Sequence, residues 1–306
     1  MARVLPARAL HASGRSIPIV SACEHYSGSE RFIRKSMELQ SSSERPFDLT
    51  MDLEDGAPVG REDEHLQMVV DLLSQRARRE KRRIGVRTHD IRSPFFVGEL
   101  TAILGEVGEK VDYVVIPKIK NRGDVEYASS LMQEVAKDTN REAMWPLHIL
   151  IESQRALNDL FPIAAHPDVE TLDFGAMDFI SDHLGALPAD CTKSPAQFEH
   201  ALMRRAKTQI VAAALLNGVV PAHNVTTDLS DPAAARHDAR RARREFGFLR
   251  MWSIHPSQIE PIIEGMAPDG LELARSIRVL LTAQDADWGP IRFEDELMDR
   301  ASYRLA

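Results

Sequence analysis

Polar side chains recur at the ends of short apolar runs in this sequence. Glu152 follows the run Leu147–Ile151, and Asp178 comes shortly after the run Thr171–Gly175. If these runs are neighbouring parallel strands, both carboxylates lie at one rim of the sheet and repel each other unless a cation or proton lies between them. Mg²⁺ fits such a place, because it often takes one or two protein carboxylates and completes its octahedron with water and substrate oxygens. The residues leave one alternative open, in which each acid only caps the following helix.

Arg87 ends another apolar run, after Ile84-Gly85-Val86, and its guanidinium is expected at the same rim. An arginine there can bind a carboxylate in bidentate fashion or stabilise an enolate oxygen, since it never loses its charge. The structural alternative is an ion pair with Glu54 or Asp55. The two roles are compatible, because these acids could fix the arginine from behind while it faces the substrate.

Two further residues follow predicted strands. His255 could serve in acid–base chemistry or bind a substrate oxygen, and it could equally be a structural histidine that hydrogen-bonds backbone. Lys118 suggests a Schiff-base aldolase, which requires a lysine that has lost its proton. The nearby Lys120 and Asp124, together with the competing carboxylate pair, disfavour that second mechanism.

The elements that must position these residues are short Val- and Ile-rich runs alternating with longer amphipathic segments, a pattern typical of βαβ units and a parallel sheet. The predicted strands are Ile17–Cys23, Phe47–Leu53, Arg83–Arg87, Tyr113–Lys118, Leu147–Ile151, Thr171–Gly175, Ala222–Thr227 and Met251–Ile254. The predicted helices are Glu30–Gln40, Glu62–Glu80, Gly98–Gly105, Gly123–Lys137, Leu157–His166, Ala196–Asn217, Pro232–Phe246 and Gly270–Gln284.

This alternation predicts an α/β protein with a (β/α)8 TIM barrel, since eight strands with intervening helices favour a closed barrel over an open sheet. We place the barrel in residues 1–256 and a C-terminal helical and polar extension, a lid or oligomer contact, in residues 257–306. No Gly-rich dinucleotide motif or Walker A pattern follows a predicted strand, which disfavours nucleotide binding.

Composition excludes several other classes of function. The formal net charge of -8 disfavours nucleic acid as a partner, because phosphate neutralisation needs a basic surface. The sequence shows no membrane-spanning stretch, so no membrane partner is expected. Only Cys23 and Cys191 occur, outside any metal or redox spacing, and we expect a cytoplasmic protein.

The ordered series of motifs resembles the citrate lyase β-subunit family, which includes malyl-CoA lyases and lies within the HpcH/HpaI aldolase superfamily. The matching segments are Arg15-Ser16, Asp52-Leu53-Glu54-Asp55, Val86-Arg87, Ile116-Pro117-Lys118, Ile151-Glu152-Ser153, Phe174-Gly175-Ala176-Met177-Asp178, Ile254-His255-Pro256-Ser257-Gln258-Ile259 and Leu297-Met298-Asp299. The resemblance implies a metal-dependent lyase in which Glu152 and Asp178 hold Mg²⁺ and Arg87 lies against substrate.

The resemblance also implies which other residues surround the substrate, namely Arg15, Glu54, Asp55, Lys118, Gly175, Ala176 and Met177. The implied reaction cleaves a β-hydroxyacyl compound, similar to citryl-CoA or malyl-CoA, into an acyl enolate and a 2-oxo acid. Asp299 or His255 is the expected acid or base. The resemblance further implies a homo-oligomer, a trimer or hexamer, in which Asp299 reaches the site of a neighbouring subunit.

Two alternatives stay open beside this lyase. Family members commonly have the sequence LFVPG in a region that helps to accommodate coenzyme A, whereas this chain has the different segment Ile19–Tyr26 there. The acyl group therefore need not be carried on coenzyme A. A type II aldolase acting on free hydroxy-oxo acids is therefore the rival enzyme, and a basic, adenine-sized groove near Arg15, Arg31 and Arg34 would distinguish the two. The alternative of another class is a catalytically silent partner subunit.

Overall fold

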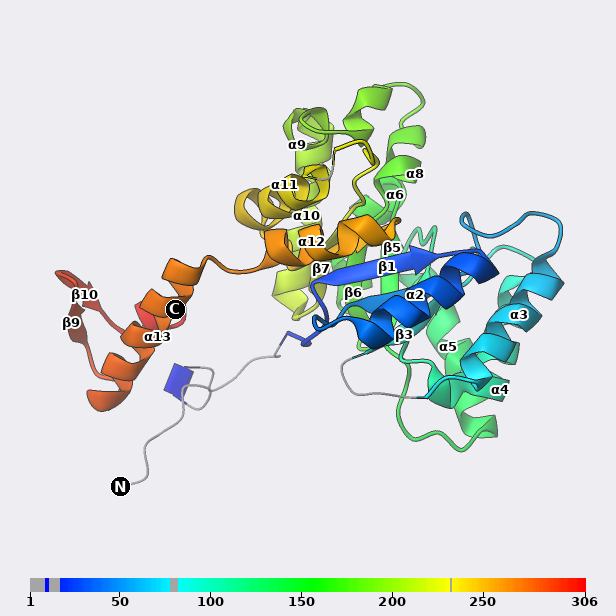
Figure 1. Ribbon diagram of the computed structural model, residues 1–306, viewed down its shortest axis with the longest axis horizontal. Coiled ribbons are helices and arrows are strands. Elements are labelled where there is room, and N and C mark those ends of the chain that lie inside the picture. Colours follow the sequence, from blue (N-terminus) through cyan, green and yellow to red (C-terminus); the bar gives the residue numbers. More distant parts are fainter. Residues whose placement is uncertain (1–8, 11–16, 78–81, 232) are drawn as a thin grey trace. The chain divides into compact units, whose positions relative to one another are not determined.

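The strands form one closed parallel barrel, as predicted. The structure is a computed structural model that describes residues 9–10, 17–77, 82–231 and 233–306. Each strand pairs with the next in sequence and β8 closes on β1 (Figure 1). The strands are β1 Cys23–Ser27, β2 Asp48–Asp52, β3 Ile84–Arg87, β4 Tyr113–Ile116, β5 Leu147–Ile151, β6 Val169–Phe174, β7 Val220–His223 and β8 Arg250–Ser253.

Helices follow the strands and cover the outside of the barrel. They are α2 Glu30–Ser42, α3 Glu62–Ser74, α4 Phe96–Val107, η1 Gly108–Lys110, α5 Arg122–Asp138, α6 Gln154–Asn158, α7 Leu160–Ala164, α8 Ala176–Ser181, η2 Ala189–Thr192, α9 Ala196–Glu199, α10 Ala201–Asn217, α11 Ala234–Arg241, η3 Ala242–Phe246, η4 Pro256–Gln258 and α12 Ile259–Met266. Their local signals are ordinary ones. Asn121 caps α5 by accepting from Asp124 N, and α10 ends at Gly218, whose φ of 66° suits glycine.

The first strand was misplaced by the sequence pattern. It was predicted at Ile17–Cys23, but β1 begins where that run ends. Pro18 lacks a backbone donor, and Ile19 is fully exposed, so the apolar segment is not in the sheet. The true strand was concealed because Glu24 points into the barrel, where an apolar residue was expected.

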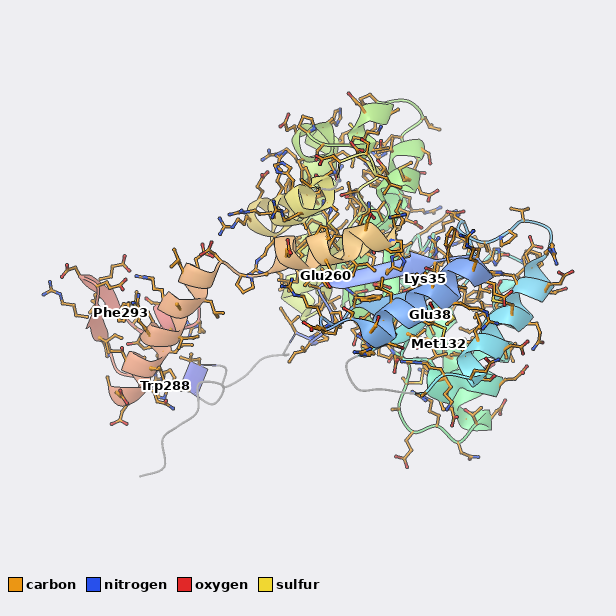
Figure 2. All side chains as sticks on the ribbon, in the orientation of Figure 1. Lys35, Glu38, Met132, Glu260, Trp288 and Phe293 are labelled. Carbon is orange, nitrogen blue, oxygen red and sulfur yellow. The ribbon has the colours of Figure 1, made fainter. Side chains whose placement is uncertain are left out.

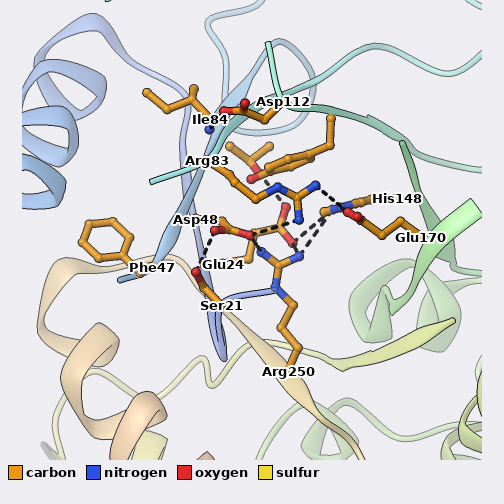
Figure 3. A network of polar contacts seen from close by, with 12 residues as sticks. Ser21, Glu24, Phe47, Asp48, Arg83, Ile84, Asp112, His148, Glu170 and Arg250 are labelled. Carbon is orange, nitrogen blue, oxygen red and sulfur yellow. Dashed lines mark hydrogen bonds and ion pairs between the residues drawn. The ribbon is translucent and has the colours of Figure 1, made fainter. Parts of the chain in front are cut away.

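The barrel interior holds two groups of side chains of different chemistry. One is a mainly aromatic and apolar cluster of Tyr26, Tyr113, Val115, Leu150, Ala222 and Trp252. The other is a buried ion network (Figure 3), which joins Arg250 to Glu24 and Asp48, and Glu170 to Arg83 and His148. Because charges this deep are costly unless paired, the network ties together six strands or strand ends that must meet in the correct register.

The barrel unit extends from Ile17 to Met266 and so includes α12, which lies beyond the boundary expected at residue 256. A Cβ added at Gly265 would lie 2.6 Å from the carbonyl oxygen of Arg236, so α12 and α11 pack at close range. Among the described residues no helix is both long and apolar enough to span a membrane.

The second compact unit contains the residues from Ala267 onward together with Ala9 and Leu10. Its elements are α13 Gly270–Asp285, β9 Ile291–Phe293, β10 Glu296–Met298 and α14 Arg300–Tyr303. It has a small core of its own, formed by Leu10, Val279, Ala283, Trp288, Ile291, Met298 and Tyr303. Trp288 and Phe293 are labelled in Figure 2.

Candidate active site

A cavity of about 960 Å³ opens at the carboxyl ends of the barrel strands, the end at which active sites of this fold lie. Residues from strands far apart in the sequence line it. Of the residues predicted from sequence, it is lined by Asp55, Arg87, Glu152, Gly175, Ala176, Met177, Asp178 and His255. The clustering follows from the closed barrel, which brings the ends of all strands to one rim.

Glu152 is the residue directly after β5, and it is 5% exposed. One of its oxygens, Oε2, accepts a 2.7 Å hydrogen bond from the backbone nitrogen of Lys118. Gly175 lies against the same side chain, since a Cβ there would be 2.2 Å from Glu152 Cγ. Burial, and after it the negative charge of Asp178, raise the pKa of Glu152 to about 8.

Asp178 was expected to end the sixth strand. It does not, because β6 stops at Phe174. It lies in the first turn of α8, half-buried and on the cavity wall. The two carboxylates nevertheless face one cavity and repel each other. This donor set fits Mg²⁺, because a divalent cation would remove both the repulsion and the cost of burying the Glu152 charge.

Arg87 ends β3 and is held mainly by Asp52, which was named from the sequence within a motif but not as a partner of Arg87. Its Nε and Nη2 donate to the two carboxylate oxygens of Asp52 at 2.7 and 2.5 Å. Glu54, predicted as its brace, also contributes, with its Oε2 3.2 Å from Arg87 Nη1. Asp55, the other predicted brace, lies instead 3.5 Å from the Lys118 ammonium. Strand register could have identified Asp52 as the partner, because Asp52 lies directly opposite Arg87 in the β2–β3 pair.

Lys118 is arranged as a structural cation. It has a φ of 54°, which directs its backbone nitrogen to Glu152, while its ammonium pairs with Glu54. Burial alone would lower the pKa of Lys118, but the carboxylates of Glu54 and Asp55 outweigh it and raise the pKa. A lysine held in the charged form cannot attack a carbonyl, which argues against Schiff-base chemistry at this residue.

The other predicted residues have diverse positions. His255 is exposed on the cavity wall, and its Nδ1 contacts the Ser257 hydroxyl at 2.7 Å, which leaves Nε2 available. Met177 is 53% exposed there. Asp299 belongs to the second unit, where it caps α14 by accepting from Ala301 N and Ser302 N. Arg15 lies outside the described residues.

His25 and Tyr26 follow the strand that was expected at Ile17–Cys23, and both lie within β1. The ring of Tyr26 stacks on Trp252 with centroids 4.8 Å apart, and both line the cavity. Trp252 was missed, because a tryptophan inside an apolar run is usually a core residue. The only indication that it lies near the rim is its position two residues before Ile254, where the predicted strand ends.

A second group of potential metal ligands, Glu24, His148 and Asp173, lies deep in the barrel. We do not assign the metal there, because the Arg250 guanidinium is 2.8 Å from Glu24 Oε2 and already supplies the compensating charge. His148 is likewise engaged, with Nε2 2.9 Å from Glu170. A cation added beside the arginine would be repelled by it.

One wall of the cavity is basic. Arg31, Arg34 and Lys35 project from α2 and line it. Arg34 pairs with Glu30 at 2.8 Å, and Lys35 lies 3.8 Å from Glu38 (Figure 2). This wall provides positive charge on an otherwise acidic protein, at the place where a basic groove was expected.

The sequence matches the family described as HpcH/HpaI aldolase/citrate lyase over residues 37–256. An L-malyl-CoA/beta-methylmalyl-CoA lyase of Rhodobacter capsulatus is 26% identical over 235 residues, which cover 73% of this chain and 74% of that protein. A citrate lyase subunit beta-like protein of Deinococcus radiodurans is 28% identical, covering 70% of this chain and 69% of its own.

Solved structures agree with the fold. A citrate lyase of Burkholderia xenovorans has a TM-score of 0.90 and 42% identity, covering 99% of this chain and 92% of that one. The protein CitE of Mycobacterium tuberculosis, solved with magnesium, acetoacetate and coenzyme A, has a TM-score of 0.69 at 20% identity, covering 94% and 97%. That second likeness concerns the fold alone.

Proposed function

The chain belongs to the HpcH/HpaI aldolase/citrate lyase family, and on that premise we propose that it is a Mg²⁺-dependent carbon–carbon lyase. It cleaves a β-hydroxyacyl thioester into an acyl enolate and a 2-oxo acid. One observation carries the proposal: the buried Glu152 and the half-buried Asp178 share a cavity with Arg87, which is braced by two acids. Relatives of this chain are named malyl-CoA lyases, which supports the same chemistry.

Glu152 and Asp178 would hold the ion. When bound, Mg²⁺ supplies Lewis acidity toward the oxygen that becomes the keto group and toward the neighbouring carboxylate. Lys118 N, by donating to one Glu152 oxygen, leaves the other oxygen for this role. Gly175 leaves the space that this carboxylate occupies, because any larger residue at position 175 would overlap the Glu152 side chain.

Arg87 stabilises negative charge on the departing enolate. Because Asp52 occupies Nε and one N–H of Nη2, the guanidinium cannot rotate, and its remaining N–H groups keep one direction. A donor fixed before the reaction costs no reorganisation when charge develops. Arg87 remains charged throughout, since Asp52 and Glu54 more than offset the effect of burial and raise its pKa.

The reaction also needs a base for the hydroxyl proton and an acid for the enolate carbon. His255 can act from the cavity wall through its Nε2, and Asp299 can act only if the second unit brings it to a site. We place Asp299 in the site of a neighbouring chain, within a homo-oligomer such as a trimer or hexamer. The complementation experiment in the Discussion tests that placement.

Coenzyme A is the proposed acyl carrier. Its diphosphate and 3′-phosphate would meet the basic wall of Arg31, Arg34 and Lys35, which favours a CoA thioester over a free hydroxy-oxo acid. Both cysteines lie buried and free of disulfides, which fits the reducing cytoplasm as the compartment.

The function is tested by incubating the protein with Mg²⁺ and malyl-CoA, citramalyl-CoA or citryl-CoA and measuring release of the 2-oxo acid. We expect turnover that EDTA abolishes and that excess Mg²⁺ restores. Cleavage of free hydroxy-oxo acids alone would favour the CoA-independent aldolase. Lack of any turnover, with Mg²⁺ bound, would favour the silent partner subunit.

A further inference from the structure

The floor of the cavity presents hydrocarbon to the ligand. Tyr26 and Trp252 lie with ring centroids 4.8 Å apart and planes inclined by 25°, and both rings line the cavity. Their polar atoms, Tyr26 OH and Trp252 Nε1, are fully buried and have no hydrogen-bond partner among the described residues. A polar atom without exposure cannot meet a ligand, so only the ring faces do.

This floor lies beside the reacting groups. The Arg87 guanidinium stands over the Tyr26 ring at 5.3 Å, and Val225 packs against the same aromatic cluster and lines the same cavity. The apolar surface therefore lies beside Arg87, in the cavity that the carboxylate pair also lines. A hydrocarbon substituent there would be buried, which is worth about 10–200-fold in selection for one methylene.

The charges around the floor disfavour an additional carboxylate. Arg87, the cation at the floor, keeps N–H groups for the enolate, but its single charge is outweighed by the two carboxylates of Asp52 and Glu54. Among the described residues that line the cavity, the other cations are exposed and project from α2 rather than from a barrel strand, namely Arg31, Arg34 and Lys35. A second carboxylate at the floor would thus meet rings and acids, and would lose its hydration without gaining an unmatched cation.

We propose that the Tyr26–Trp252 floor makes this site select a 2-oxo acid with a short alkyl side chain over the dicarboxylic oxaloacetate. The inference rests on the proposed function, because it assumes that the carboxylate pair and Mg²⁺ bind the 2-oxo acid. It narrows that function to cleavage of hydroxyacyl thioesters whose hydroxyl-bearing carbon carries a methyl or ethyl group. Oxaloacetate, with a carboxymethyl group at that carbon, is then a poor product and a poor ligand.

Calorimetry with three ligands tests the selection without any acyl-CoA. Pyruvate, 2-oxobutanoate and oxaloacetate share the same chelating head, so the contribution of the metal site cancels between them. In the presence of saturating Mg²⁺ we expect the better of the two alkyl acids to bind at least about tenfold more tightly than oxaloacetate. 2-Oxobutanoate separates size from charge, because its ethyl group is closer in length to the carboxymethyl group.

Variants of the full chain locate the selection at the floor. Val225→Arg adds a cation at the half-buried cavity wall and should move the pyruvate-to-oxaloacetate affinity ratio at least about tenfold toward oxaloacetate. Tyr26→Ser should also lower the ratio, whereas Tyr26→Phe should keep it, since the hydroxyl does not face the ligand. Phe161→Ser, at an exposed aromatic residue outside the cavity, is the matched control, and circular dichroism monitors folding.

The outcomes separate this inference from the proposed function. Equal or tighter binding of oxaloacetate by the unaltered protein overturns the inference while the lyase assignment stands. An altered ratio in Tyr26→Phe overturns the apolar floor, because the hydroxyl would then contact the ligand. Absence of Mg²⁺-dependent binding for all three acids overturns both the inference and the proposed site.

Discussion

Asp52 holds Arg87 through both carboxylate oxygens, at 2.7 Å from Nε and 2.5 Å from Nη2. The two residues are direct partners in the β2–β3 register, and both are nearly buried. Asp52 is itself fixed, because the backbone nitrogens of Glu54 and Gly56 donate to it. The guanidinium is therefore preorganised by a carboxylate that cannot move.

This pair predicts a large loss of activity when the planar fork is removed. Arg87→Lys keeps a positive charge but cannot match both oxygens of Asp52 and still face the substrate, so kcat should fall about 10²–10³-fold. Steady-state kinetics measures the loss. The control is Arg83→Lys. Arg83 is also a partly buried arginine paired with a carboxylate, that of Glu170, but it belongs to the ion network and not to the cavity. Similar kcat values for the two variants would show that Arg87 has only a structural role.

Gly175 predicts a selective loss of metal binding. In Gly175→Ala the new Cβ would approach Glu152 Cγ to 2.2 Å, so the carboxylate must move. We expect Mg²⁺ affinity to fall about 10–100-fold, as when a supporting group of a metal site is lost. Gly98→Ala is the control, because a Cβ there meets nothing within 4 Å. Unchanged Mg²⁺ affinity in Gly175→Ala would exclude Glu152 as a ligand.

The pKa of Glu152 predicts how Mg²⁺ binding depends on pH. In the metal-free protein, burial and the charge of Asp178 raise this pKa to about 8, so the carboxyl group is largely protonated at neutral pH. Only the carboxylate binds the ion, so affinity should rise about tenfold per pH unit up to that pKa and then level off. Calorimetry in buffers of different ionisation enthalpy should detect release of about one proton at pH 7. A pH-independent affinity in the wild-type protein would contradict this, and Glu152→Gln should not bind at all.

The sequence predicted the fold well because alternation of apolar runs and amphipathic segments reflects burial directly. It failed at β1, where Glu24 and the partners of the ion network make an interior strand polar. No local pattern reveals that Arg250, more than two hundred residues later, will neutralise Glu24. Pairing between such distant residues becomes visible only when the barrel closes.

The candidate site shows the same division. Glu152 and Arg87, which follow or end a strand, could be placed at the cavity because their position fixes their direction. Asp178 was placed on the correct rim but on the wrong element, since a helix turn rather than a strand presents it. Trp252 could not be recognised, because a tryptophan that packs in a core and one that forms a cavity floor occur in the same apolar pattern.

Asp173 predicts an effect of pH on stability that comes from the interior rather than from the active site. Its carboxyl group is fully buried, and neither oxygen has a hydrogen-bond partner of good geometry among the described residues; Thr171, Glu24, His148 and Arg250 lie around it. Burial, and then the charge of Glu24, raise its pKa from 3.8 to about 7. The folded state therefore binds this proton more tightly, and the associated stability is complete below pH 3.8 and is lost as pH rises through about 7.

Asp173→Asn removes this titration and nearly preserves the shape of the side chain. The unfolding free energy of the wild type relative to the variant should fall by on the order of 1 kcal/mol per pH unit within that window. Urea unfolding at a series of pH values measures the difference. His148 is common to both proteins, so its own titration largely cancels. A difference that stays constant with pH would mean that Asp173 is ionised in the folded protein.

Asp299 predicts activity that depends on two chains. It lies in the second compact unit, where it caps α14, and an exposed carboxylate of this kind can act as a proton donor or acceptor only when a site encloses it. Asp299→Asn should lower kcat about 10²–10⁴-fold and leave Mg²⁺ binding unchanged. Asp269→Asn, which alters the cap of α13 in the same unit, is the control for loss of a helix cap.

Complementation decides whether Asp299 acts on its own chain or on a neighbour. Glu152→Gln lacks one of the two proposed metal ligands but has an intact Asp299, whereas Asp299→Asn has both ligands and lacks the acid. Each variant alone should therefore be inactive. If Asp299 reaches a neighbouring site, mixed oligomers contain some sites with both groups intact, and activity should return after the two variants are unfolded and refolded together. Co-refolding of Asp299→Asn with wild type gives the reference for assembly, and light scattering gives the oligomeric state. No recovery from mixed oligomers, or a fully active monomer, would show that Asp299 does not act across a subunit boundary and would leave His255 as the candidate.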